Sequence, residues 1–136
     1  MATKLPAGKL LIIDDDRSST ELLVNVLSPY QQEILIANTA REGLRMAGQI
    51  QPDLIIVDLS LPDLDGLTVC RRLRAVTDRP ILALSVVDQA SMLEQALDAG
   101  ADDYLVKPVS NSILIAHLNN LARRNRSRFL PLLSNT

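Results

Sequence analysis

Carboxylates, a hydroxyl and a lysine each follow directly on a short apolar run of this chain. Asp14 and Asp15 follow LLII, and Asp58 follows LIIV. Ser85 follows ILAL, and Lys107 follows YLV. Crowded carboxylates repel one another unless protons or a cation offset their charge. Mg²⁺ suits a site that offers a few carboxylates, waters and a phosphoryl group, so these residues indicate a magnesium site.

The same residue types point to phosphoryl transfer. A carboxylate beside a cation can attack phosphorus and form an acyl phosphate. Asp14, Asp15 and Asp58 supply three negative charges, and Mg²⁺ with Lys107 supplies three positive ones. The two cations would offset charge on the transferring group, and the Ser85 hydroxyl would donate to a phosphoryl oxygen.

The apolar runs are predicted to be strands of a parallel sheet buried on both faces, because they lack alternation of apolar and polar residues. They span Leu10 to Ile13, Glu33 to Ala37, Leu54 to Val57, Ile81 to Leu84 and Tyr104 to Val106. Stretches of helical period lie between and after them. Strands alternating with helices predict an α/β fold, in which ligands bind beyond the carboxyl ends of the strands. The carboxylates, Ser85 and Lys107 are therefore expected to lie together at that edge.

Apolar residues at helical spacing mark five predicted helices: Leu22, Leu23, Val26 and Leu27; Ala40, Leu44 and Ala47; Val69, Leu73 and Val76; Leu93, Ala96 and Leu97; and Leu114, Leu118, Leu121 and Ala122. Helix starts are predicted at two capping boxes and three further N-caps, namely Ser18 with Glu21, Thr39 with Glu42, Asp65, Asp88 and Ser110. Asp16 is interpreted as a helix-start residue, Asp63 as part of the turn before Gly66, and Gly100 as a C-cap.

Composition bounds the class of protein. The chain has 136 residues, of which 47% are hydrophobic and 22% charged, as in an ordinary single globular domain. A net charge of −2 gives no basic bias toward nucleic acid or membrane surfaces. Cys70 is the only cysteine and His117 the only histidine, which excludes an internal disulfide and multi-histidine metal sites. No apolar run approaches the roughly 20 residues of a membrane span, so a cytoplasmic protein is expected.

Four motifs, LLIIDDD, IIVDLSLPDLDG, LALS and GADDYLVKP, together resemble the receiver domains of two-component response regulators. The resemblance covers about residues 9–125, with 1–8 expected to be a flexible N-terminus and 126–136 a tail or the start of a linker. It implies a flavodoxin-like, doubly wound sheet of five parallel strands in order 2-1-3-4-5, with two helices on one face and three on the other. The Lys107–Pro108 bond is cis in that family.

By this resemblance, Asp58 is the phosphoacceptor and takes its phosphoryl group from a histidine kinase or a phosphotransfer protein. Asp14, Asp15, Asp58 and the backbone carbonyl of Ser60 would hold Mg²⁺. Lys107 matches the family's lysine beside the phosphoryl group. The chain is accordingly expected to be a signalling module and not an enzyme.

Ser85 and Tyr104 take the places of the family's switch residues. Phosphorylation is expected to draw Ser85 toward Asp58 and open space for Tyr104, which changes the surface of the fourth helix, fifth strand and fifth helix. That surface would control a partner or an output domain beyond the C-terminus, and a homodimer through it is possible. However, the family's charged dimer contacts are largely absent, with Ile113 and His117 at two of their positions.

The lifetime of the phosphoryl group depends, by resemblance, on the residues two beyond Asp58 and two beyond Ser85. These are Ser60 and Val87. Val87 has no hydrogen-bonding side chain and is β-branched, so we expect slow hydrolysis. The alternative is that Val87 merely extends the fourth strand.

Two other functions compete with the receiver interpretation. A haloacid-dehalogenase-type phosphatase would use Asp14 and Asp16 as an Asp-x-Asp pair, with Asp14 as the nucleophile, although 136 residues are few for such an enzyme. An unphosphorylated scaffold is the third alternative. Mapping the position of the aspartyl phosphate separates the receiver, phosphorylated at Asp58, from the phosphatase, phosphorylated at Asp14.

Overall fold

The computed structural model describes residues 8–29 and 33–129, with side chains described as far as Arg124. The strands are β1 (Lys9–Ile13), β2 (Glu33–Ala37), β3 (Leu54–Asp58), β4 (Ile81–Ser85) and β5 (Asp103–Val106). The helices are α1 (Arg17–Leu27), α2 (Ala40–Ile50), α3 (Gly66–Val76), α4 (Ala90–Ala99) and α5 (Asn111–Phe129). Strands and helices therefore alternate along the chain, as predicted.

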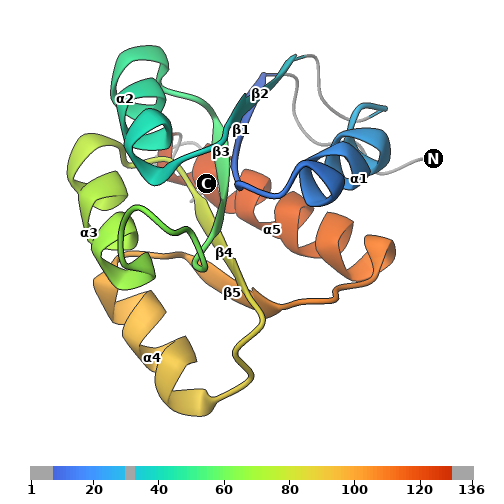
Figure 1. The fold of residues 1–136 in the computed structure, drawn as a ribbon. Helices are drawn as coiled ribbons and strands as arrows, with labels where there is room; N and C mark the ends of the chain where they lie inside the picture. The colour runs from blue at the N-terminus through green and yellow to red at the C-terminus, as the bar shows by residue number, and fades with distance from the viewer. Residues whose placement is uncertain (1–7, 30–32, 130–136) are drawn as a thin grey trace.

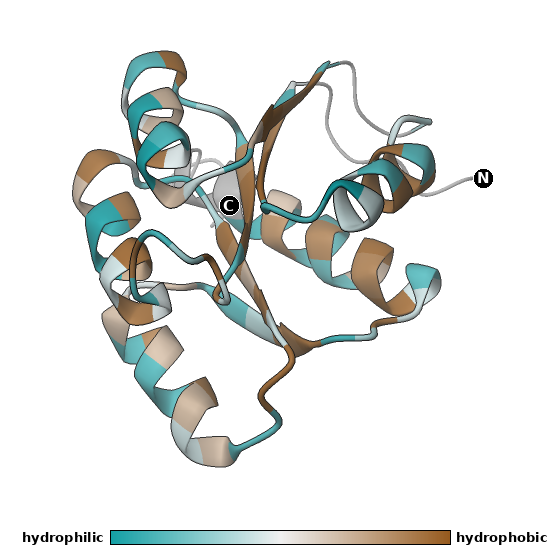
Figure 2. Cartoon of the chain, in the orientation of Figure 1, coloured by the Kyte–Doolittle hydropathy of each residue, from teal (hydrophilic) through white to brown (hydrophobic). Residues whose placement is uncertain are grey.

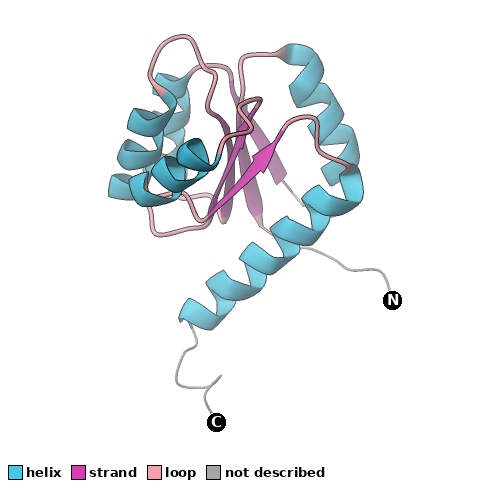
Figure 3. Cartoon of the chain, turned by 90° about the horizontal axis from the view of Figure 1, so that it is seen from below, coloured by secondary structure: helices cyan, strands magenta, loops and turns pink. Residues whose placement is uncertain are grey.

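The strands form one parallel sheet in the order β2-β1-β3-β4-β5, which confirms the predicted flavodoxin-like arrangement. α1 and α5 cover one face, and α2, α3 and α4 cover the other (Figure 1). Seen from below, the sheet stands between the two helical layers, and α5 continues past its edge (Figure 3). The Lys107–Pro108 peptide bond is cis.

The core is aliphatic and lies on both sides of the central strands. Every residue of β3 and β4 is buried, as are the last four of β1, and the sheet is the most hydrophobic part of the fold (Figure 2). Burial on both faces was predicted for all strands, but β2 and β5 are only partly buried. These two are the edge strands, which have a neighbour on one side only and less cover from the helices.

Several predicted helix ends are confirmed. The Thr39 hydroxyl accepts from the Glu42 amide at 3.1 Å, and Asp65 accepts from the Thr68 amide at 3.2 Å. Ser110 Oγ accepts from the Ile113 amide at the start of α5. Gly100 ends α4 with φ of 130°, a conformation that residues with a Cβ rarely adopt.

Two predicted N-caps are wrong. Asp16, not Ser18, caps α1, because its carboxylate accepts from the amides of Ser18 and Ser19. This agrees with Asp16 as a helix-start residue. Gln89, not Asp88, precedes α4, and its side chain makes no capping hydrogen bond. A spacing rule alone does not separate neighbouring polar residues that are all able to cap a helix.

Some apolar residues at helical spacing lie at the surface instead of in the core. Leu22 of α1 is 63% exposed and Val76 of α3 is 41% exposed. In α4 only Ala96 is buried, while Leu93 and Leu97 are exposed. In the described part of the chain, none of the helices is both long and apolar enough to span a membrane.

Candidate functional site: an acidic cluster at the carboxyl edge of the sheet

The register of the sheet brings the predicted site residues to one edge. Ile13 pairs with Val57, so the residues that follow them, Asp14 and Asp58, come side by side. Ser85 pairs with Val106, and the Lys107 amide donates to the Ser85 carbonyl at 2.8 Å. Parallel strands thus carry the polar residues at their ends to a common site.

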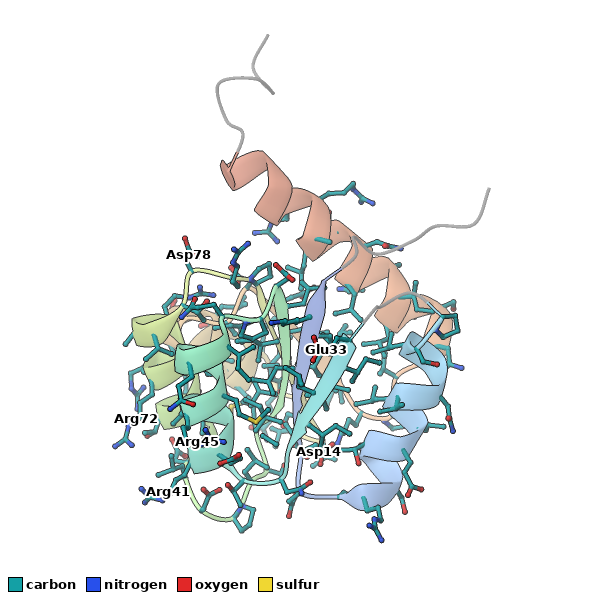
Figure 4. The ribbon with its side chains drawn as sticks, turned by 90° about the horizontal axis from the view of Figure 1, so that it is seen from above. Asp14, Glu33, Arg41, Arg45, Arg72 and Asp78 are labelled. Carbon is teal, nitrogen blue, oxygen red and sulfur yellow. The ribbon has the colours of Figure 1, made fainter. Side chains whose placement is uncertain are left out.

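Asp14, Asp15 and Asp58 form a compact acidic cluster. Each offers a carboxylate oxygen, and these oxygens all lie within 4.8 Å of one another. Asp14 and Asp58 are buried, with 1% and 7% of their surface exposed, whereas Asp15 is exposed. Figure 4 shows Asp14 where β1 gives way to the loop that leads to α1.

Lys107 is the cation of the cluster. Its Nζ lies 3.2 Å from Asp58 Oδ2 and 3.4 Å from Asp14 Oδ2. Burial alone would lower the pKa of Lys107, but attraction to Asp58 and then Asp14 outweighs it, so the pKa lies above its ordinary value. Lys107 therefore stays charged through the neutral range, and one positive charge faces three carboxylates.

Backbone amides orient both buried carboxylates. Asp14 Oδ1 accepts from the Asp16 amide at 3.0 Å, and Asp58 Oδ1 accepts from the Ser60 amide at 2.9 Å. The loop after β3 turns back closely, because a Cβ on Gly66 would stand 2.6 Å from the Leu59 carbonyl oxygen. Gly66 lets α3 begin against this loop and so holds the Ser60 segment beside Asp58.

The cluster fits the donor set of a hard divalent cation. Three carboxylates within 4.8 Å and a single lysine leave excess negative charge, two of the acids being buried. Crowded carboxylates bind Mg²⁺ or Ca²⁺ through oxygen. Asp14, Asp15 and Asp58 are the described side chains that would hold such an ion.

Ser85 and Tyr104 stand beside this edge but are linked through the loop after β4. Ser85 Oγ accepts from the Val87 amide at 3.0 Å, and the Tyr104 hydroxyl donates to the Val87 carbonyl at 2.5 Å. Tyr104 is buried. Val87 follows the end of β4 at Ser85, so it does not extend that strand.

The surface of α4, β5 and α5 combines exposed apolar residues with an acid–histidine contact. Leu93, Leu97 and Ile113 are exposed. His117 Nδ1 lies 2.6 Å from Asp103 Oδ2 and joins α5 to β5 within the chain. His117 is therefore engaged at one edge of this surface and lies away from the acidic cluster.

The sequence did not reveal three interactions at or near the site, which involve Ser19, Asp63 and the backbone of Val87. Ser19 Oγ lies 3.4 Å from Lys107 Nζ, but nothing in its spacing separates it from Ser18. Asp63 lies in the predicted turn, yet its carboxylate accepts from the amides of Ala40 and Arg41 at the start of α2. The backbone of Val87 links Ser85 to Tyr104 through two hydrogen bonds, and backbone hydrogen bonds of a loop cannot be predicted from its residue types.

Cys70 lies away from the cluster and is buried in the core. Burial raises the pKa of its thiol to about 11. It therefore stays protonated at neutral pH, which agrees with a packing role.

Residues 10–119 match the family model described as "Response regulator receiver domain". The chain is 42% identical over 119 residues to Response regulator MprA of Mycobacterium leprae (strain TN), an alignment that covers 87% of this chain and 52% of the relative. It thus spans about half the length of the curated relatives it matches.

The fold is also similar to solved structures of response regulators. A two-component response regulator from Clostridium difficile superposes with a TM-score of 0.81 at 33% identity, covering 85% of this chain and 96% of the other. The BeF3-activated N-terminal receiver domain of Klebsiella pneumoniae RstA has a TM-score of 0.79 at 28% identity, covering 85% and 98%.

Proposed function

Because the chain belongs to the response regulator receiver domain family, we propose that it is a phosphorylation-switched signalling module whose phosphoacceptor is Asp58. The observation that carries this is the position of Asp58 at the carboxyl edge of the sheet, 3.2 Å from Lys107 Nζ and within 4.8 Å of carboxylate oxygens of Asp14 and Asp15. One Asp58 oxygen faces the Ser60 amide and the other faces Lys107. A carboxylate held in this way is oriented for attack on phosphorus.

Mg²⁺ is the proposed cofactor. Asp14, Asp15 and Asp58, with the backbone carbonyl of Ser60, would hold it. Bound there, the ion supplies positive charge against the oxygens of the transferring phosphoryl group. Lys107, whose Nζ lies 3.2 Å from Asp58 Oδ2, supplies a second positive charge and remains protonated because its pKa is raised.

The proposed phosphodonor is a histidine kinase or a phosphotransfer protein, and the proposed location of the chain is the cytoplasm. We propose a phosphoacceptor and not a phosphatase of the haloacid-dehalogenase type. Asp16 supports this choice, because its carboxylate caps α1 instead of turning toward the acidic cluster. An Asp-x-Asp pair led by Asp14 would need Asp16 in that cluster.

The output is proposed to act through the α4–β5–α5 surface. A phosphoryl oxygen that accepts from the Ser85 hydroxyl would reorient a side chain that also accepts from the Val87 amide, and the Val87 carbonyl accepts from the Tyr104 hydroxyl. A local charge thereby biases the loop before α4. The exposed Leu93, Leu97 and Ile113 support contact with a partner, an output domain or a second copy of the chain.

The proposed receiver domain occupies residues 9–125, and residues 126–136 form a tail or the start of a linker to an output domain. α5 continues to Phe129, so the helix itself would form the first part of that connection.

The test is incubation of the wild-type chain with acetyl phosphate and Mg²⁺, followed by intact-mass measurement. Wild type is expected to gain one phosphoryl group, and Asp58→Asn is expected to gain none. Omission of Mg²⁺ with a chelator present should stop the reaction in wild type. Equal uptake by both proteins would contradict the assignment of Asp58.

A further inference from the structure

A cavity of about 520 Å³ opens on the face covered by α1 and α5, next to the acidic cluster. Its walls are mostly apolar and come from α1, from the end of β4, from the segment after β5 and from the start of α5. The apolar residues that matter here are Leu22, Val26, Leu84, Val86, Val109 and Leu114. A cavity of this size and lining fits a small ligand with an apolar part.

Part of the cavity wall is polar and lies next to the proposed phosphoacceptor site. Lys107 and Ser19 line the cavity, and their side chains lie 3.4 Å apart. Lys107 Nζ also lies 3.2 Å from Asp58 Oδ2. Lys107 therefore stands between the cavity and Asp58, and Asp16 is an acid that also lines the cavity.

The outer wall of the cavity leaves apolar surface in water. Leu22 and Val86 are 63% and 66% exposed, the highest values among the large apolar residues in the described part of the chain. Both line the cavity. A ligand that covers them removes apolar area from water, which favours binding in proportion to that area.

We propose that this cavity receives the hydrocarbon tail of small acyl phosphates. The protein would then accept phosphoryl groups from acyl phosphates with a longer apolar tail in preference to acetyl phosphate. This inference rests on the proposed role of Asp58. The phosphoryl group lies at Asp58 and Lys107, and the acyl chain extends between α1 and the segment after β5. An apolar wall gives no such advantage to a donor without a hydrocarbon tail.

The reaction needs no further reactant. A carboxylate oxygen of Asp58 forms a bond to phosphorus, and the bond between phosphorus and the acyl oxygen breaks. The electron pair of the broken bond leaves with the carboxylate product, and no proton is required. Lys107 stands where it offsets the negative charge during the transfer.

The experiment measures initial rates of Asp58 phosphorylation in the full chain with Mg²⁺ and subsaturating acetyl phosphate, butanoyl phosphate or phosphoramidate. The two acyl donors have leaving groups of similar acidity, so their ratio reports binding of the tail. Two buried methylenes are expected to make butanoyl phosphate faster by about tenfold. Phosphoramidate has no acyl group and reports the phosphoacceptor chemistry alone.

Leu22→Gln tests the location, and Val76→Gln is the matched control. Both residues are exposed apolar side chains on helices, but Val76 lies on α3, on the other face of the sheet. Leu22→Gln should bring the butanoyl-to-acetyl ratio toward one, whereas Val76→Gln should keep the wild-type ratio.

Three results would overturn the proposal. A wild-type ratio near one, with Asp58 labelled by every donor, rejects the acyl site while the phosphoacceptor function stands. A high ratio that Leu22→Gln leaves unchanged rejects this cavity as the site. Failure of every donor to label Asp58 rejects the proposed function and this inference with it.

Discussion

Asp15 differs from the other two acids of the cluster because its side chain is exposed, while Asp14 and Asp58 are buried. Its removal should therefore change the metal site without leaving a hole in the core. We expect Asp15→Ala to weaken Mg²⁺ binding by roughly tenfold or more, because the remaining carboxylates do not replace its charge and coordination. Calorimetric titration with Mg²⁺ measures the effect.

Asp16→Ala is the control for this variant. It removes the neighbouring acid, which caps α1 and lies outside the cluster. Loss of an N-cap costs about 1 kcal/mol in the free energy of unfolding. Mg²⁺ affinity should stay close to that of wild type, and an equal loss of affinity in both variants would mean that net charge alone binds the ion.

The side chain of Val87 is expected to affect how long the phosphoryl group stays on Asp58. Its side chain has no hydrogen-bonding group to hold a water in line with the phosphorus. Val87→Glu should therefore speed loss of the phosphoryl group by about a hundredfold, the low end of what a positioned general base contributes. The measurement follows phosphorylated protein after removal of the donor. Decay at the wild-type rate or slower would reject the role of water access.

At the scale of elements, Asp63 joins the loop after β3 to the start of α2. Its acceptance of the Ala40 amide outweighs burial and, with the Arg41 amide, lowers the pKa of Asp63. A lowered pKa in the folded state means that the stabilisation is present above the ordinary pKa of about 3.9 and is lost as the pH falls. Asp63→Asn should thus destabilise the protein at pH 7.

Urea unfolding of wild type and Asp63→Asn at several pH values tests this. The difference in the free energy of unfolding should shrink as the pH falls below about 4, because protonation then removes the charge from wild type as well. A difference that stays constant over this range would show that the carboxylate charge contributes nothing.

The loop between β4 and α4 carries the prediction for the switch. Ser85→Ala removes the acceptor of the Val87 amide and the hydroxyl proposed to meet the phosphoryl group. The variant should still take up phosphate at Asp58, yet show no change in the environment of Tyr104 on phosphorylation. Tyrosine fluorescence or the NMR signals of its ring report this. A normal response in Ser85→Ala would place the coupling elsewhere.

The strands and helices could be predicted where the local pattern of apolar residues agrees with their burial in the fold. Runs such as LLII and ILAL have no polar alternation, and β1 and β4 are buried on both faces. Prediction failed where tertiary contacts decide. Leu93 and Leu97 have core-like spacing, but α4 buries only Ala96, and spacing alone does not say how deeply a helix sits.

At the scale of the whole molecule, the site was predictable because parallel strands end at one edge. Asp14, Asp58 and Lys107 each follow or end a strand of the sheet, so topology alone brings them together. Ser19 comes from a helix and reaches Lys107 through the docking of α1, which no local signal encodes. The inward position of Tyr104 likewise depends on the loop carbonyl that meets it.

The central claim is that this fold accepts a phosphoryl group at Asp58, and the most direct measurement is the position of the acyl phosphate. The chain is phosphorylated with acetyl phosphate and Mg²⁺, the acyl phosphate is reduced with borohydride, and peptides are sequenced by mass spectrometry. The account predicts homoserine in place of aspartate at position 58, with position 14 unmodified. Homoserine at position 14 in place of 58 would contradict it and favour the phosphatase alternative.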